Sequence, residues 1–109
     1  MSELAKKKCK PCEGGVPAYS AEQARNMLQG LKGWILEDGR LVKVYPFANY
    51  HHTMAFVNAL AWISHREDHH PDLEVGYNKC RVTYWTHAVD GLSENDFICA
   101  AKCDALSEL

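Results

Sequence analysis

The chain has 109 residues, a length that suits one domain able to bury a small core. Apolar residues make up 47% of it and charged residues 24%, which is ordinary for a soluble globular protein. The formal net charge of −2 gives no global preference for nucleic acid or an anionic membrane. No stretch approaches the roughly 18 apolar residues that span a bilayer. We therefore expect neither nucleic-acid nor membrane partners.

Residues 1–18 are predicted to form a flexible leader ahead of a single α+β domain over residues 19–109. The leader contains lysines but no apolar core behind them, so it is not typical of a secretory signal. The chain has five cysteines, an odd number, and three of them fall in expected strands or helices. This usage favours a reducing, cytoplasmic setting over a disulfide framework.

A helix and a hairpin are the first expected elements of the domain. Ser20-Ala21-Glu22-Gln23 is a capping box, and helix-forming residues follow it up to Gly30. Asp38-Gly39 separates two apolar runs, 34–37 and 40–45. A two-residue hairpin turn needs φ > 0 at both positions, and Asp-Gly meets that need. Pro46 is expected to end the second strand.

A long helix is expected from about Asn49 to about Glu67, ending before Pro71. The helical period predicts one apolar side, flanked by further apolar residues, and one wetter side. The apolar side comprises Tyr50, Met54, Val57 and Ala61, with Phe56, Leu60 and Ile63 beside it, and the wetter side comprises His51, Asn58, Trp62 and His65.

Two strands and a helix complete the expected order. A strand over 73–77 leads through a turn to a strand over 80–86. Ser93 then caps a helix whose inward residues are Phe97, Ile98, Ala100, Ala101 and Ala105. Because short turns force antiparallel pairing, the order α-β-β-α-β-β-α predicts a four-stranded antiparallel sheet with three helices on one face.

Three histidines near expected element ends could do chemistry. His69 and His70 precede Pro71 in a rigid corner, and His87 ends the last expected strand. Adjacent side chains of an extended segment point to opposite sides, so His69 and His70 should have different tasks. Imidazole transfers protons near neutral pH, which favours acid–base catalysis. The alternative is that these histidines cap helix ends or lie solvated at turns.

These histidines belong to a longer spaced pattern: Asp68-His69-His70-Pro71, Tyr77-Asn78-Lys79, Thr86-His87, and Gly91 to Phe97. Over roughly residues 18–106 the pattern resembles the pterin-4a-carbinolamine dehydratase family. The leader, with Cys9-Lys10-Pro11-Cys12, looks like that of bacterial members linked to phenylalanine hydroxylase. The resemblance implies the helix and strand order given above, assembly as a dimer or tetramer, and no metal or organic cofactor.

The resemblance also implies an activity and a site. The family removes water from a 4a-hydroxytetrahydropterin to give quinonoid dihydropterin, in tetrahydrobiopterin recycling for aromatic amino-acid hydroxylation. His69 and His87 would be the acid–base pair, and His70 would complete the catalytic group by orienting the pterin. Asp96 would support the site, and His65 stands where the family commonly has an acidic residue. The pterin would be bound by Trp34, His69, His70, Pro71, Thr86, His87, Ala88 and Val89.

Other interpretations remain open from the residues alone. Asp96 near a helix start and Trp34 beside a hairpin both suit structural roles. A hydrolase or metal site on the same histidines is possible, although carboxylates are sparse near them. A non-catalytic interaction module is another possibility, since animal members of the family also bind a transcription factor. Four thiolates could bind zinc: Cys9, Cys12, Cys99 and Cys103. Cys99 and Cys103, however, also suit the core side of a helix.

Overall fold

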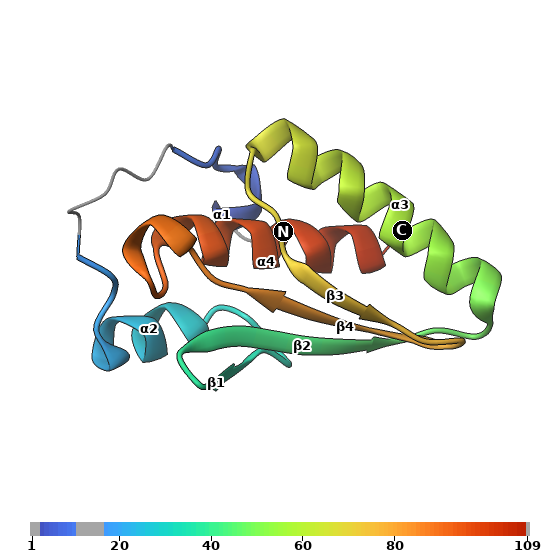
Figure 1. Ribbon diagram of the computed structural model, residues 1–109, viewed down its shortest axis with the longest axis horizontal. Coiled ribbons are helices and arrows are strands. Elements are labelled where there is room, and N and C mark those ends of the chain that lie inside the picture. The colour runs from blue at the N-terminus through green and yellow to red at the C-terminus, as the bar shows by residue number, and fades with distance from the viewer. Residues whose placement is uncertain (1–2, 11–16, 109) are drawn as a thin grey trace.

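The computed structural model describes residues 3–10 and 17–108. The strands form one antiparallel sheet in the order β1-β2-β4-β3. The predicted fold class and the order α-β-β-α-β-β-α are confirmed, with a short helix α1 and a 3-10 turn η1 in addition (Figure 1). The elements are α1 (Glu3–Lys6), α2 (Ala21–Leu28), β1 (Ile35–Glu37), β2 (Arg40–Pro46), α3 (Tyr50–Glu67), β3 (Asp72–Val75), β4 (Lys79–Tyr84), η1 (His87–Val89) and α4 (Glu94–Ser107).

Helices α3 and α4 cover one face of the sheet (Figure 1). Alternate residues of β2 and β4 point toward them, because side chains alternate between the two faces of a strand. These strand residues share one core with Ala24 of α2, Leu60 of α3 and Phe97 of α4. Each large side chain fully buried there stabilises the fold by about 1.5–3 kcal/mol. The core therefore holds the helices on the sheet, and the candidate site lies where α3 ends and α4 begins.

Local signals in the sequence produce the expected turns and caps. Ser20 and Gln23 make both hydrogen bonds of the capping box. Asp38 and Gly39 have φ of 51° and 75°, as the two-residue hairpin requires. No helix in the described part of the chain is long and apolar enough to cross a membrane.

The buried side of α3 differs from the predicted one. Its buried residues are Thr53, Phe56, Leu60 and Ser64, whereas Tyr50 is 52% exposed. Two hydroxyl residues can lie in this stripe because backbone carbonyls satisfy them. Thr53 donates to the carbonyl of Tyr77 at 2.9 Å, and Ser64 donates to that of Leu60 at 2.9 Å. A prediction from apolar spacing alone treats Thr53 and Ser64 as exposed polar residues, and it therefore places the buried side of α3 on other residues.

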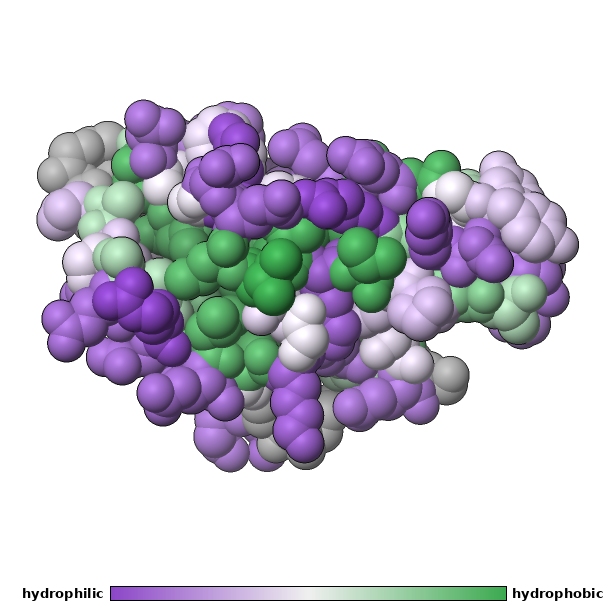
Figure 2. All heavy atoms as spheres, turned by 90° about the horizontal axis from the view of Figure 1, so that it is seen from below, coloured by the Kyte–Doolittle hydropathy of each residue, from purple (hydrophilic) through white to green (hydrophobic). Residues whose placement is uncertain are grey.

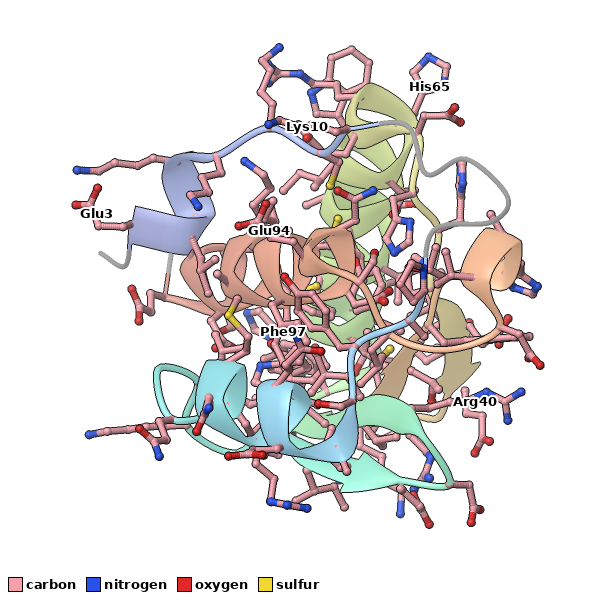
Figure 3. The ribbon with its side chains drawn as sticks, turned by 90° about the vertical axis from the view of Figure 1, so that its left-hand side faces the viewer. Glu3, Lys10, Arg40, His65, Glu94 and Phe97 are labelled. Atoms are coloured by element: carbon pink, nitrogen blue, oxygen red, sulfur yellow. The ribbon has the colours of Figure 1, made fainter. Side chains whose placement is uncertain are left out.

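The N-terminal segment Glu3–Lys10, part of the predicted leader, lies against the domain. Helix α1 packs against α4, and Lys102 donates from its ammonium group to the carbonyl of Ala5 at 2.8 Å. The Lys7 ammonium lies 2.9 Å from the Glu94 carboxylate. Residues 11–16, the rest of the expected leader ahead of Pro17, lie outside the described residues. Figure 3 shows the N-terminal segment, labelled at Glu3 and Lys10, running along α4.

Candidate active site

A cavity of about 630 Å³ lies where the end of α3, the chain leading into β3, and η1 meet. It brings together six of the residues that the sequence predicts for the site, which come from two stretches of chain far apart in sequence. These six are His69, His70, Pro71, Thr86, His87 and Ala88. A cavity of this size is in the range of small-molecule sites.

His69 is held firmly at the inner side of this cavity. Asp68 ends α3 in the left-handed conformation, with φ of 50°. It turns the chain so that the backbone N–H of His69 donates to the backbone carbonyl of Ser64 at 3.2 Å. The side chain is only 11% exposed, and its Nε2 lies 2.6 Å from Oδ1 of Asp96. Its ring stacks on that of Tyr84, with 5° between the planes. Both its position and its rotation are therefore fixed.

Asp96 is fully buried, and it connects the helix start to this histidine. Its second oxygen, Oδ2, accepts from the hydroxyl of Thr86 at 2.7 Å and from the backbone N–H of Ser93 at 3.0 Å. The carboxylate thus closes the capping box of α4 and lies at the positive end of the helix dipole. The structural role and the supporting role belong to the same side chain.

The contact between His69 and Asp96 has a chemical consequence. With Nε2 donating to the carboxylate, the other ring nitrogen, Nδ1, is left to meet a ligand. A buried carboxylate that sets the tautomer and angle of an imidazole, and stabilises it when protonated, is a recurrent arrangement in acid–base catalysis.

His87 reaches the cavity from a turn, which differs from the prediction that it ends a strand. Strand β4 stops at Tyr84, and a bridge between Thr86 and Gly91 closes a short loop that contains η1. The His87 ring is exposed and lies 3.8 Å from the ring of Trp85, measured between centroids. Trp85 also lines the cavity, and sequence reasoning did not single it out.

His70 also lines the cavity but is exposed, in contrast to the largely buried His69. The two neighbouring histidines therefore occupy different environments. That the two histidines have different tasks stays a prediction.

Three predicted site residues lie elsewhere. Trp34 is 3% exposed and donates from Nε1 to the carboxylate of Asp104 at 3.1 Å, so it is a core residue away from the cavity lining. His65 is exposed near Trp62 and points away from the body of the molecule (Figure 3). Val89 belongs to η1 but does not line the cavity.

Part of the cavity wall comes from the N-terminal segment, which sequence reasoning set apart from the domain. Cys9, Lys10 and Asn95 all line it. The Asn95 side chain accepts from the backbone N–H of Lys10 at 3.0 Å and donates to the carbonyl of Lys10 at 2.6 Å. The backbone N–H of Cys9 donates to the Glu67 carboxylate at 2.8 Å. No periodicity signals such contacts, because they join residues 58 and 85 positions apart.

The zinc alternative gains no support from the described cysteines. Cys9 and Cys99 have their sulfur atoms 3.4 Å apart, whereas Cys103 contacts the hydroxyl of Tyr84. Cys12 lies outside the described residues. Among residues 3–10 and 17–108, no three His, Cys, Asp or Glu side chains are grouped so that they could hold a metal ion.

The fold and the cavity together define a small α+β protein with an oriented histidine in a ligand-sized site. The chain belongs to the Pterin 4 alpha carbinolamine dehydratase family, whose sequence model matches residues 17–106. Membership classes it as a hydro-lyase.

Relatives that carry the dehydratase's name are similar over nearly the whole chain. A protein of Nitrosomonas eutropha is 64% identical, covering 97% of this chain and 95% of its own. One of Nitrosospira multiformis is 58% identical, covering 100% and 96%. The crystal structure of a transcriptional coactivator/pterin dehydratase from Brucella melitensis matches with a TM-score of 0.79 at 26% identity, covering 82% of this chain and 97% of that one.

A second solved structure is similar over less of the chain. It is a pterin dehydratase-like protein described as a RuBisCO assembly factor in the alpha-carboxysome. Its TM-score is 0.58 at 28% identity, and the match covers 68% of this chain and 86% of that one.

Proposed function

We propose that this protein eliminates water from a 4a-hydroxytetrahydropterin by histidine acid–base catalysis and releases quinonoid dihydropterin. The observation that carries the proposal is the contact of 2.6 Å between His69 and the buried Asp96, in a cavity that His70 and His87 also line. Elimination needs a base and an acid, and this cavity offers imidazoles in distinct surroundings.

In the proposed reaction, Nδ1 of His69 takes the proton from N5 of the substrate. The electron pair of the broken N–H bond forms the double bond between N5 and C4a. The bond between C4a and its hydroxyl oxygen breaks at the same time. His87, protonated, supplies the proton with which the hydroxyl leaves as water. Asp96 stabilises the positive charge that forms on His69, and His70 positions the ring.

The proposed setting is the cytoplasm, where the product would be reduced again for an aromatic amino-acid hydroxylase such as phenylalanine hydroxylase. The odd number of cysteines, with Cys80, Cys99 and Cys103 buried in β4 and α4, supports a reducing compartment. The proposed assembly is a homo-oligomer, either a dimer or a tetramer.

Single alanine variants of the three histidines test the proposal. We expect His69→Ala and His87→Ala each to lower kcat by roughly 10²- to 10⁴-fold, the usual contribution of a general acid or base. His70→Ala should mainly raise KM, since it would remove binding that the ground state and transition state share. Turnover is measured on enzymatically generated carbinolamine, above the uncatalysed background.

His51→Ala is the matched control, because this exposed histidine of α3 is not among the residues that line the cavity. It should leave both kinetic constants unchanged. If folded His69→Ala and His87→Ala both kept a near-normal kcat, the histidines would be structural and the proposed mechanism would be wrong.

A further inference from the structure

The N-terminal segment Glu3–Lys10 brings one thiol of the cavity wall against a thiol of the core. The sulfur atoms of Cys9 and Cys99 are 3.4 Å apart. Cys9 lies on the segment and lines the cavity, whereas Cys99 is fully buried on α4. A disulfide needs about 2.05 Å between the sulfur atoms, so the two would have to approach by little more than one ångström.

The backbone near Cys9 is already held beside α4. The backbone N–H of Cys9 donates to Glu67, and Asn95 bonds both backbone groups of Lys10. Asn95 is four residues before Cys99, which is one turn of α4. The two thiols are thus placed by contacts other than their own.

We propose that Cys9 and Cys99 form a reversible disulfide, which fastens the N-terminal segment as a fixed wall of the cavity. The effect on the cavity rests on the proposed pterin function, but the formation of the bond does not. The oxidant is a peroxide, and a small dithiol reverses the reaction.

The chemistry balances with one peroxide for each disulfide. The Cys9 thiolate attacks a peroxide oxygen, the O–O bond breaks, and the released hydroxide takes a proton to become water, leaving a sulfenic acid on Cys9. The Cys99 sulfur then attacks the Cys9 sulfur. The S–O bond breaks, and a second water leaves with the thiol proton of Cys99.

The surroundings assign the order of these two steps. Cys9 is partly exposed and faces the cavity, so it can meet peroxide first. The neighbouring Cys9 thiol and burial both raise the pKa of Cys99, which keeps it protonated. Cys103 is fully buried and its sulfur contacts the hydroxyl of Tyr84, not Cys9, so that thiol should not compete.

The experiment treats the full chain with hydrogen peroxide and maps cross-linked peptides by mass spectrometry without reduction. We expect loss of two of the five thiols and a peptide that joins Cys9 to Cys99. The melting temperature should rise, because the bond closes a long loop of the unfolded chain. The backbone amides of Cys9 and Lys10 should also exchange hydrogen more slowly. Dithiothreitol should reverse each change.

Matched cysteine variants separate this bond from others. Cys9→Ser and Cys99→Ser should abolish the response, while Cys103→Ser and Cys12→Ser should retain it. A cross-link between Cys9 and Cys12, sulfenic acid that never resolves, or one zinc ion per chain bound by these thiols would each overturn the proposal.

The effect on the cavity is measured separately by dehydratase turnover. A fixed wall should hinder pterin entry, so oxidation should lower kcat/KM in the wild type but not in Cys9→Ser. If the mapped disulfide forms and kcat/KM is unchanged, the link to the cavity is wrong although the bond is real. Absence of turnover in the reduced protein would contradict the proposed function, and the peptide map would still decide the disulfide.

Discussion

At the scale of single residues, Asp96 connects the fold to the proposed chemistry. One oxygen meets His69, and the other accepts from Thr86 and from the backbone of Ser93. Asparagine has nearly the same shape but carries one acceptor and one donor group. If the NH2 group of the asparagine faces the backbone N–H of Ser93, two donors oppose each other. If the NH2 group instead faces Nε2 of His69, that nitrogen must accept, and the imidazole is forced into the other tautomer.

Asp96→Asn should therefore lower kcat by roughly 10²-fold, as expected when a general base is misoriented. It should also cost about 1–2 kcal/mol of unfolding free energy through the damaged cap. Asp104→Asn is the control, because this α4 carboxylate lies in a hydrogen-bonded network with Trp34, away from the cavity. It should lower stability without lowering kcat, measured by steady-state kinetics and chemical denaturation. A normal kcat in Asp96→Asn would show that Asp96 acts only as a cap.

Independence from metal ions also belongs to the residue scale. In the proposed reaction imidazoles perform both proton transfers, so no Lewis acid is required. Exhaustive chelation followed by dialysis should leave turnover unchanged, with metal content followed by elemental analysis. Activity that fell on chelation and returned with zinc would contradict this assignment of roles.

At the scale of elements, the sequence predicts what local chemistry decides. The Ser20 capping box and the Asp38-Gly39 turn each depend on neighbours a few residues away, and both form as predicted. The side of α3 that is buried depends on the sheet and on the carbonyl of Tyr77, 24 positions from Thr53, so apolar spacing could not assign it.

Some features of the candidate site can likewise be predicted from local sequence, and others depend on residues far along the chain. The corner at His69 to Pro71 is visible in sequence because proline restricts it. The docking of Cys9 and Lys10 is not, because it needs Glu67 and Asn95 from the ends of two helices. The sequence could, by contrast, predict Asp96 as the partner of His69, since Asp96 follows a capping serine and belongs to the same spaced pattern.

Trp34, the residue immediately before β1, is bonded to α4 and gives a prediction at this scale. Its indole donates to Asp104, which also accepts from Lys43 and from the hydroxyl of Tyr45. Trp34→Phe removes the donor and leaves a smaller ring in the core. We expect a loss of about 1–3 kcal/mol of unfolding free energy and an unchanged KM. A raised KM with intact stability would instead place Trp34 in contact with the pterin.

At the scale of the whole molecule, the sheet has two open edges, β1 and β3. Unpaired edges in a small domain tend to be covered or to pair with another copy. Apolar side chains are exposed along the sheet, including Ile35 on β1 at 54% and Val75 on β3 at 43%. Figure 2 shows apolar side chains gathered on the underside of the molecule, the side on which β1 lies in Figure 1. Most of the first half of α4, in contrast, is already buried within one chain.

We therefore predict a homodimer or larger assembly that pairs through a sheet edge. Light scattering at micromolar concentration should give at least twice the monomer mass of 12.3 kDa. Ile35→Lys and Val75→Lys distinguish the two edges, because a charge desolvated at the contact strongly opposes association. One of them should yield folded monomers. Trp62→Lys, which changes an exposed residue of α3, is the control and should retain at least a dimer. A strictly monomeric wild type would reject the assembly, and monomers formed only by Trp62→Lys would place the contact on α3.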